Sequence, residues 1–318
     1  MSSMKRNLYS FREAAEPWHL FPLSSLFVFG LSSLALAAPT RTHEKRGNLA
    51  KRASVTQTPT TGYATQNGST TGGKRGSTTT VSTYAQFTAA VTDGTARIVI
   101  VKGTITKAAR IKVGSNKSII GQDSSASLLL ASVFYIKSKK NVIVRNLSIS
   151  KVLVANGDAI GIQASTNVWV DHCDVSSDTD HDKDYYDGLV DVTHASDFVT
   201  ISNTFLHDHW KASLVGHSDS NGDEDTGHLR VTYNNNYWYN IHSRGPSVRS
   251  GTVHIYNSYY LSVDNGINTR DGAVVLVQSN GFDGSSKPLY STDSGYAVAS
   301  DNVFGDEGRI KPSRVPLG

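Results

Sequence analysis

Short apolar stretches recur along the chain with one shared pattern of hydrophobic and polar positions. In each stretch two apolar residues flank a single intervening position, and an Asn or His stands two residues after the second of them. The copies are Val142-Val144-Asn146, Val168-Val170-His172, Val199-Ile201-Asn203, Val231-Tyr233-Asn235, Val253-Ile255-Asn257 and a weaker Leu276-Gln278-Asn280. This alternation with a period of two predicts short β-strands that bury one face.

The spacing of these predicted strands indicates how they are arranged. Successive copies are 26, 31, 32, 22 and 23 residues apart, which favours a parallel β-solenoid with one coil per copy. Val and Ile would then stack inside, and inward Asn side chains would hydrogen-bond along the stack. A β-sandwich is the alternative, because its strands alternate as well. Two-residue hairpin turns are scarce, however, so we expect an all-β parallel solenoid.

Two different segments precede the repeats. Residues 81–91 predict an amphipathic helix, because apolar side chains recur there at helical spacing. Residues 53–76 consist largely of Thr, Ser, Gly and Gln, with almost no large apolar side chain. This composition predicts a flexible arm. The solenoid domain is therefore expected over residues 77–318.

The N-terminal 52 residues indicate targeting and processing. Basic residues precede an apolar stretch that ends in small residues, so we expect a secretory signal peptide over 1–38. An uncleaved membrane anchor is the alternative, which the Pro, Gly and Ser residues within the stretch disfavour. Dibasic pairs at Lys45-Arg46 and Lys51-Arg52 then predict a propeptide over 39–52.

Removal of this leader changes the charge of the protein. The whole chain has a formal net charge of +4, but residues 1–52 hold 8 Lys or Arg and 3 Asp or Glu, so the remainder carries −1. We therefore expect a secreted monomer with no nucleic-acid partner and no membrane attachment once the signal is removed. The single cysteine, Cys173, excludes an intramolecular disulfide. Three sequons, at Asn67, Asn116 and Asn146, permit glycosylation.

Acidic residues gather in one connection between predicted strands. Residues 173–191 contain seven Asp, which is consistent with either a solvated loop or a site for a hard cation. Asp187 and Asp191 lie at the end of this segment, and Asp158 opens the preceding coil. Equivalent positions of neighbouring coils stack about 4.8 Å apart. These three carboxylates therefore form a plausible calcium site.

Basic residues follow in the next coils. Lys211 comes after the strand predicted around 199–205, and Arg244 and Arg249 frame a short segment containing Gly245 and Pro246. Ordinary solvated side chains are the alternative interpretation. Arginine is suited to bidentate recognition of carboxylates, and lysine binds them as a point charge. A cation site beside fixed basic residues favours a polyanion bearing carboxylates, such as polygalacturonate.

These motifs together resemble one enzyme family. Trp169-Val170-Asp171-His172, the acids near Asp187, and the later Arg244-x-Pro246-x-x-Arg249 are similar to the pectate lyases of polysaccharide lyase family 1. The resemblance covers about residues 76–310 and is strongest to the fungal branch. It implies a right-handed parallel β-helix and an extracellular, Ca²⁺-dependent enzyme that acts on pectate.

The resemblance also implies roles for individual residues. Asp158, Asp187 and Asp191 match the Ca²⁺ ligands, although Asn156 stands where the family often has a further acid. Lys211 and Arg249 match the residues that bind substrate carboxylates, and Arg244 matches the catalytic base. Trp169, Asp171 and His172 are interpreted as structural.

The implied reaction is β-elimination. The C5 proton of a galacturonate would be removed by Arg244 as the C4–O4 bond opens, while calcium stabilises the resulting negative charge. Because arginine is almost always protonated, an alkaline optimum is expected. A pectin lyase acting on methyl-esterified polymer without calcium, a β-helical polygalacturonase and a non-catalytic pectin-binding solenoid are the alternatives. The acid cluster argues against the first, and its pairing with three basic residues argues against the second.

Overall fold

The computed structural model describes residues 54–129 and 132–305, all of which belong to one compact unit. The expected signal peptide over 1–38 and propeptide over 39–52 lie outside the described residues. Within the described ranges, no helix combines the length and apolar character needed to cross a bilayer.

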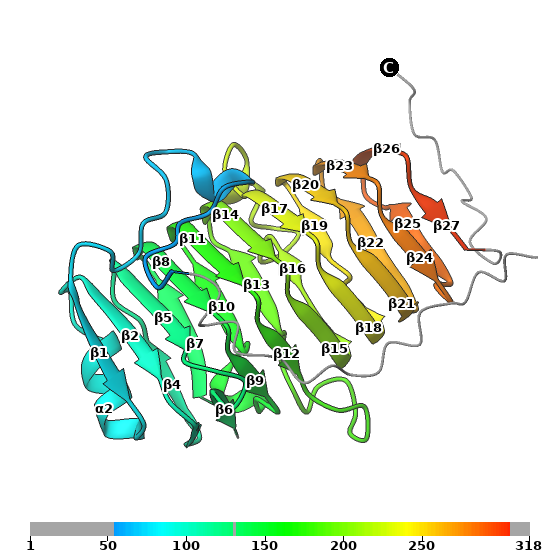
Figure 1. The fold of residues 1–318 in the computed structure, drawn as a ribbon. Coiled ribbons are helices and arrows are strands. Elements are labelled where there is room, and N and C mark those ends of the chain that lie inside the picture. The colour runs from blue at the N-terminus through cyan, green and yellow to red at the C-terminus, as the bar shows by residue number, and fades with distance from the viewer. Residues whose placement is uncertain (1–53, 130–131, 306–318) are drawn as a thin grey trace, which may run out of the picture. The chain divides into compact units, whose positions relative to one another are not determined.

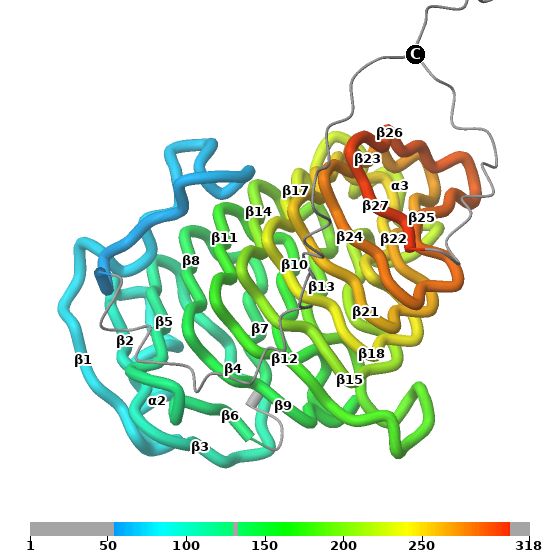
Figure 2. The backbone as a smooth tube through the Cα atoms, turned by 45° about the vertical axis from the view of Figure 1, so that its right-hand side comes forward, coloured from blue at the N-terminus to red at the C-terminus, as the bar shows by residue number. Residues whose placement is uncertain are grey.

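The described residues form a parallel β-solenoid made of three sheets (Figures 1 and 2). Each complete coil contributes one strand to each sheet, and neighbouring strands within the three sheets pair in parallel, as β11 does with β8 and β14. This confirms the all-β solenoid and excludes a sandwich, whose sheets are antiparallel.

The three sheets are named here A, B and C. Sheet A contains β1 (Ser77–Val81), β2 (Arg97–Val101), β5 (Lys117–Gly121), β8 (Lys140–Arg145), β11 (Thr166–Asp171), β14 (Asp197–Ser202), β17 (Arg230–Asn234), β20 (Thr252–Tyr256), β23 (Val274–Gln278) and β26 (Tyr296–Ser300). Sheet B contains β3 (Thr104–Thr106), β6 (Ser127–Leu129), β9 (Ser148–Ser150), β12 (Asp174–Ser176), β15 (Phe205–Lys211), β18 (Tyr237–Ser243), β21 (Tyr259–Val263), β24 (Gly281–Asp283) and β27 (Val303–Phe304). Sheet C contains β4 (Ala109–Lys112), β7 (Ser132–Lys137), β10 (Ile160–Gln163), β13 (Val190–Thr193), β16 (Leu214–Val215), β19 (Ser247–Arg249), β22 (Asn265–Arg270) and β25 (Lys287–Ser291). The helical elements are η1 (Tyr63–Thr65), α2 (Tyr84–Val91), η2 (Val154–Asn156) and α3 (Gly222–Asp225).

The repeat found in the sequence fixes the register of sheet A for five of its six copies. Val168 pairs with both Val142 and Val199, and the later copies continue in the same register. The sixth copy is wrong by one residue, because Val275 and Val277, not Leu276 and Gln278, continue the column. Residues 274–277 are uniformly apolar, so alternation alone cannot specify which of them faces inward.

The recurring Asn and His residues occupy left-handed turns at the end of the sheet A strands. Their φ angles lie between 49° and 55° in Asn146, His172, Asn203, Asn235 and Asn257. Asparagine tolerates this backbone region better than most residues. An inward ladder does exist and includes Asn280 of the weaker sixth copy, but its other members are Asn residues outside the repeat pattern. It consists of Asn236, Asn280 and Asn302, whose Nδ2 groups donate to carbonyl oxygens of Ile201, Ile255 and Val277.

The solenoid core is a column of stacked side chains. Val142, Val168 and Val199 are fully buried on sheet A. On sheet B an aromatic column begins at Trp238, which stacks on Tyr260 with ring centroids 5.6 Å apart, and continues through Phe282. Because successive coils repeat the same inward position, one buried side chain covers the next along the axis.

Helix α2 lies at the N-terminal end of the solenoid, next to β1 (Figure 1). It begins at Tyr84 rather than at Val81, which ends β1. Thr83 caps the helix by accepting a hydrogen bond from the Gln86 amide. The buried Phe87 ring packs edge-on against Phe134, 5.9 Å between centroids, so the helix covers apolar core that the first coil would otherwise expose.

The segment 54–76, for which the sequence predicts a flexible arm, lies along the outer face of sheet A. The amide of Tyr63 donates to Thr232 Oγ1 and that of Ala64 donates to Thr200 Oγ1, at 3.1 and 2.9 Å. Ala64 is fully buried and packs with Ile143 and Trp169. Composition alone misses this arrangement, because the hydroxyls that hold the arm belong to strands more than 130 residues away.

Candidate active site

Four of the expected site residues lie at the connections between sheets B and C in four successive coils, whereas Asp191 lies within β13 and Arg249 ends β19, both in sheet C. Asp158 precedes β10, Asp187 precedes β13, Lys211 ends β15 just before β16, and Arg244 precedes β19. These sheet C strands are neighbours in the order β10, β13, β16, β19 (Figure 1). Carboxylates and basic groups therefore form one row along the solenoid axis, about 4.8 Å apart per coil.

Two of the carboxylates meet over Gly188. Asp158 Oδ1 accepts a hydrogen bond from the Gly188 amide at 3.1 Å, and Asp191 Oδ1 accepts one from the Leu214 amide at 2.9 Å. A Cβ atom built on Gly188 would lie only 2.5 Å from Asp191 Oδ1 and 2.9 Å from Asp158 Oδ1. The absence of a side chain at this position thus leaves room for both carboxylates.

This pair of carboxylates lacks positive charge. Burial, followed by repulsion from Asp187, raises the pKa of Asp158 to about 6. Burial, followed by repulsion from Asp158, also raises the pKa of Asp191 well above its usual range. The positive charge of Arg244 lowers both pKa values but does not compensate for these effects. A bound cation would relieve the repulsion.

The fit of a metal ion to these residues is partial. In residues 54–129 and 132–305, no three His, Cys, Asp or Glu side chains converge closely enough to hold a metal by themselves. Asp158 and Asp187 nevertheless line one small hollow together with Asn156, Gln163 and Arg110. Oxygen ligands suit Ca²⁺, which takes six to eight of them. The residues present therefore fit calcium if further oxygens come from a ligand or from water.

Lys211 and Arg249 each pair with an exposed acid from a loop. Lys211 Nζ lies 3.0 Å from Asp184 Oδ1, and Arg249 Nε lies 2.5 Å from Asp219 Oδ1. Arg249 Nε also lies 3.3 Å from Asp271 Oδ2, and Asp219 is shared with Arg270. The side chains of Asp184 and Asp219 are 65% and 61% exposed. Because both acids are exposed, carboxylates of a ligand can compete with them for Lys211 and Arg249, while Asp271 stays beside Arg249.

Arg244 differs from both in its partners. Its guanidinium makes no hydrogen bond or ion pair with any residue in the described part of the chain, although its charge acts on Asp158 and Asp191. Its backbone is held, because the Ser213 amide donates to the Arg244 carbonyl at 2.9 Å. The Arg244 main chain is thus held beside the other site residues, while the guanidinium nitrogens are available to a ligand.

His209 is a site residue that the sequence reasoning missed. It is 1% exposed, and its Nε2–H donates to the Asp187 carbonyl at 2.6 Å. Burial is the largest effect on this imidazole and lowers its pKa to about 4, so it is neutral at ordinary pH. His209 therefore holds the main chain beside Gly188. Strand alternation gives no signal for it, because the left-handed residue Asp208 (φ 50°) interrupts the alternation between the buried Leu206 and His209.

The acidic connection 173–191 divides into structural and site residues. Asp178 accepts a hydrogen bond from Tyr186 at 2.8 Å and pairs with Lys151 at 3.0 Å. The Trp210 indole N–H donates to the His181 carbonyl at 2.7 Å. These contacts fasten the loop on sheet B. Asp187 and Asp191 remain for the carboxylate cluster.

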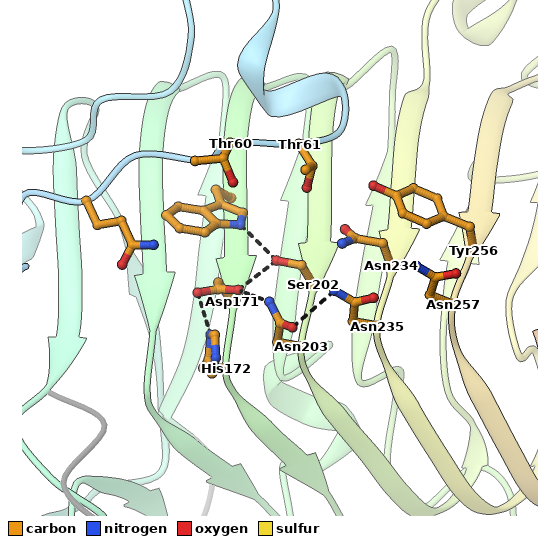
Figure 3. A pocket seen from close by; sticks show the side chains of 12 residues that line it. Thr60, Thr61, Asp171, His172, Ser202, Asn203, Asn234, Asn235, Tyr256 and Asn257 are labelled. Atoms are coloured by element: carbon orange, nitrogen blue, oxygen red, sulfur yellow. Dashed lines mark hydrogen bonds and ion pairs between the residues drawn. The ribbon is translucent and has the colours of Figure 1, made fainter. Parts of the chain in front are cut away.

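Trp169, Asp171 and His172 lie elsewhere, on sheet A. The buried Asp171 carboxylate accepts hydrogen bonds from Ser202 Oγ at 2.7 Å and Asn203 Nδ2 at 2.9 Å, and it contacts His172 Nδ1 at 2.7 Å (Figure 3). This carboxylate joins the ends of two successive sheet A strands, β11 and β14. A structural role for the three residues stays a prediction.

Comparison with known proteins agrees with this geometry. A family model described as pectate lyase matches residues 35–317. A probable pectate lyase A of Aspergillus flavus is 64% identical over 283 residues, 89% of this chain and 86% of that protein. Pectate lyase A of Aspergillus niger is 65% identical over 272 residues, 85% of this chain and 82% of that protein.

A solved structure shares both fold and sequence. The crystal structure of a pectate lyase from Bacillus sp. N165 in complex with trigalacturonate superposes with a TM-score of 0.71 and 33% identity, covering 77% of this chain and 87% of that chain. The resemblance noted from the motifs, including its fungal branch, is thereby confirmed. The chain belongs to the pectate lyase family of polysaccharide lyases.

Proposed function

We propose that this protein cleaves (1→4)-α-D-galacturonan by calcium-dependent β-elimination, releasing unsaturated oligogalacturonides during the breakdown of plant cell-wall pectin. The observation that carries the proposal is the row of groups along four coils. The buried carboxylates of Asp158 and Asp191 lie near Arg244, whose guanidinium pairs with no residue in the described ranges. Lys211 and Arg249 each pair with an exposed Asp that a ligand carboxylate can replace. A polyanion with one carboxylate per sugar matches such a row.

Asp158, Asp187 and Asp191 would hold Ca²⁺, with the remaining oxygens supplied by substrate carboxylates. When bound, the ion withdraws charge from a galacturonate carboxylate and so makes the neighbouring C5 proton more acidic. His209 keeps the Asp187 main chain in place through its Nε2–H. Gly188 leaves the space in which the carboxylates converge.

Lys211 and Arg249 position the polymer. Substrate carboxylates replace Asp184 and Asp219 on these two cations, so sugars on neighbouring coils are held in a fixed register. A methyl ester cannot make this exchange, because it carries no charge. The arrangement therefore selects de-esterified polymer.

Arg244 removes the C5 proton. A neutral guanidine nitrogen accepts the proton, the C5–H electrons form the C4–C5 double bond, and the C4–O4 bond breaks with its electron pair remaining on O4. The departing O4 then takes a proton from water. Because the guanidine must first be neutral, the rate is expected to rise toward alkaline pH.

The test follows the ultraviolet absorbance of the unsaturated product on polygalacturonate, with calcium or with chelator. Arg244→Lys should abolish turnover while calcium-dependent substrate binding survives, and Arg75→Lys, an exposed site in the arm, should behave as wild type. Near-full rate in Arg244→Lys removes Arg244 from the role of base. Activity on esterified pectin that resists chelator favours a pectin lyase, and binding without product favours a non-catalytic module.

We also propose that the enzyme acts outside the cell as a monomer. The support is the leader expected over 1–38 and the dibasic sites before Ala53. N-terminal sequencing of protein from culture medium should find Ala53 first. Recovery of the full-length chain from cell membranes would contradict this proposal.

A further inference from the structure

A second hollow, distinct from the carboxylate row, lies on the outer face of sheet A. Its volume is about 280 Å³, close to the lower end for small-ligand sites. The floor is made by the last residues of successive strands, and the arm around Thr61 forms the opposite wall (Figure 3). We call this hollow the sheet A groove.

The floor of the groove repeats with the coils. Asp171, Ser202, Asn234 and Tyr256 pair in register from β11 to β20. One polar side chain therefore recurs about every 4.8 Å along the axis. A ligand that satisfies them must itself present polar groups at repeated intervals.

One floor residue has an unused hydrogen-bond acceptor. Asn234 is 3% exposed, and its Oδ1 is buried and accepts no hydrogen bond from any residue within 54–129 and 132–305. Its side chain lies between Thr61 of the arm and Tyr256 (Figure 3). Buried polar atoms in native proteins are nearly always paired. Because Asn234 lines this groove, we take its unpaired amide oxygen to indicate a donor supplied by a ligand that enters there.

The charges around the groove exclude an anionic ligand. Asp171 is buried and already compensated, because Arg145 Nε lies 3.4 Å from it and Ser202 donates to it. Among the described residues, neither Lys nor Arg lines the groove. What remains for a ligand is a set of amides and hydroxyls, the His172 imidazole, and the Trp169 and Tyr256 rings. This set matches hydroxyl-rich, uncharged molecules.

We propose that the sheet A groove binds a neutral oligosaccharide, with a sugar hydroxyl donating to Asn234 Oδ1. The repeated floor suits a chain of sugars rather than a single one. This binding does not depend on the proposed lyase reaction, because the groove belongs to sheet A and the lyase residues lie in sheet C and at its junction with sheet B. Neutral segments of a cell-wall polymer could then be held while charged segments are cleaved elsewhere.

The experiment measures binding of β-1,4-galactotetraose and of trigalacturonate to the full chain by calorimetry. We expect the neutral sugar to bind, and Asn234→Leu, which keeps the branching of the side chain but removes the amide, to weaken its binding at least tenfold. Cleavage of polygalacturonate should be unchanged in this variant. The melting temperature should not fall, since no protein partner of Asn234 Oδ1 is lost.

A second variant protects the test against a folding defect. Asn235 is exposed at the edge of the groove with φ 55°, so Asn235→Gly keeps the backbone conformation and removes only the amide. It too should weaken galactotetraose binding. Arg244→Lys should retain full binding, which separates this site from the lyase site. Absence of galactotetraose binding to the wild-type chain, or unchanged binding in both groove variants, would overturn the proposal.

Discussion

The carboxylate pair over Gly188 gives the sharpest test of how the site is built. In Gly188→Ala the new Cβ would lie 2.5 Å from Asp191 Oδ1 and 2.9 Å from Asp158 Oδ1, whereas ordinary contacts begin at 3.4 Å. Asp191 Oδ1 must therefore move away by roughly 0.9 Å, and Asp158 Oδ1 by roughly 0.5 Å, to reach ordinary contact distance. Metal–oxygen distances tolerate changes of only about 0.2 Å. We expect calcium affinity to fall by about 10- to 100-fold.

The effect on folding should be smaller than the effect on calcium. The atoms that must move are the ends of two Asp side chains, so the free energy of unfolding in chelator should fall by about 1 kcal/mol, the lower end for overpacking. For a protein of this size that is a shift in melting temperature of about 2–4 °C. High calcium should restore much of the rate, because the base and the substrate-binding cations are unchanged.

The assay compares rate against free calcium for wild type, Gly188→Ala and a control. Gly222→Ala is suited as the control, since a Cβ there meets nothing within 4 Å. An unchanged calcium dependence in Gly188→Ala would refute convergence of the carboxylates over Gly188. A wild-type cleavage rate that does not depend on calcium would instead refute the metal proposal. It would not contradict the convergence of Asp158 and Asp191 over Gly188.

Three further variants test other parts of the structure. Asp184→Asn frees Lys211, so KM for polygalacturonate should fall at low ionic strength and the gain should vanish in high salt; an unchanged KM in dilute buffer would show that Asp184 does not compete with substrate. Burial alone would lower the pKa of His207, but hydrogen bonds to Asp174 and Asp208 outweigh burial and raise this pKa. The contribution of the charged imidazole to stability is therefore fully present below about pH 6.5 and is lost as the pH rises through the raised pKa. Thermal melts of His207→Gln should therefore show a larger deficit in acid than in alkali, and equal deficits would contradict this. Tyr260→Phe removes a buried hydroxyl that forms no hydrogen bond with any residue of the described ranges. The free energy of unfolding should therefore increase by up to about 1–3 kcal/mol, and the melting temperature should rise with it. A lower melting temperature would show that the hydroxyl has a partner.

The sequence determined the repeat unit and the residue types of the site. Alternating apolar positions at Val142, Val168 and Val199 specify a buried face, because side chains in a strand alternate whatever lies around them. The order of acids before basic residues along the chain becomes an order along the axis, since each coil follows the last. Local pattern is sufficient for these features.

Contacts between coils were decided only by the tertiary structure. The uniformly apolar run at 274–277 carries no register of its own, and its neighbour β20 supplies it. The arm is held by Thr200 and Thr232, which no composition of residues 53–76 can reveal. His209 became part of the site only when its strand turned it toward the Asp187 carbonyl.

The charges of the site show the same division. Counting acids in residues 173–191 could not tell Asp178, which accepts a hydrogen bond from Tyr186, from Asp191, whose burial and repulsion outweigh the charge of Arg244. Whether a carboxylate has a positive group beside it depends on the residues of neighbouring coils. The lengths of the connections between strands determine which residues those are. The chain by itself determined that acids, basic residues and strands would stack. The folded solenoid decided which charges stay unpaired, because desolvation and distance act only once the coils are in contact.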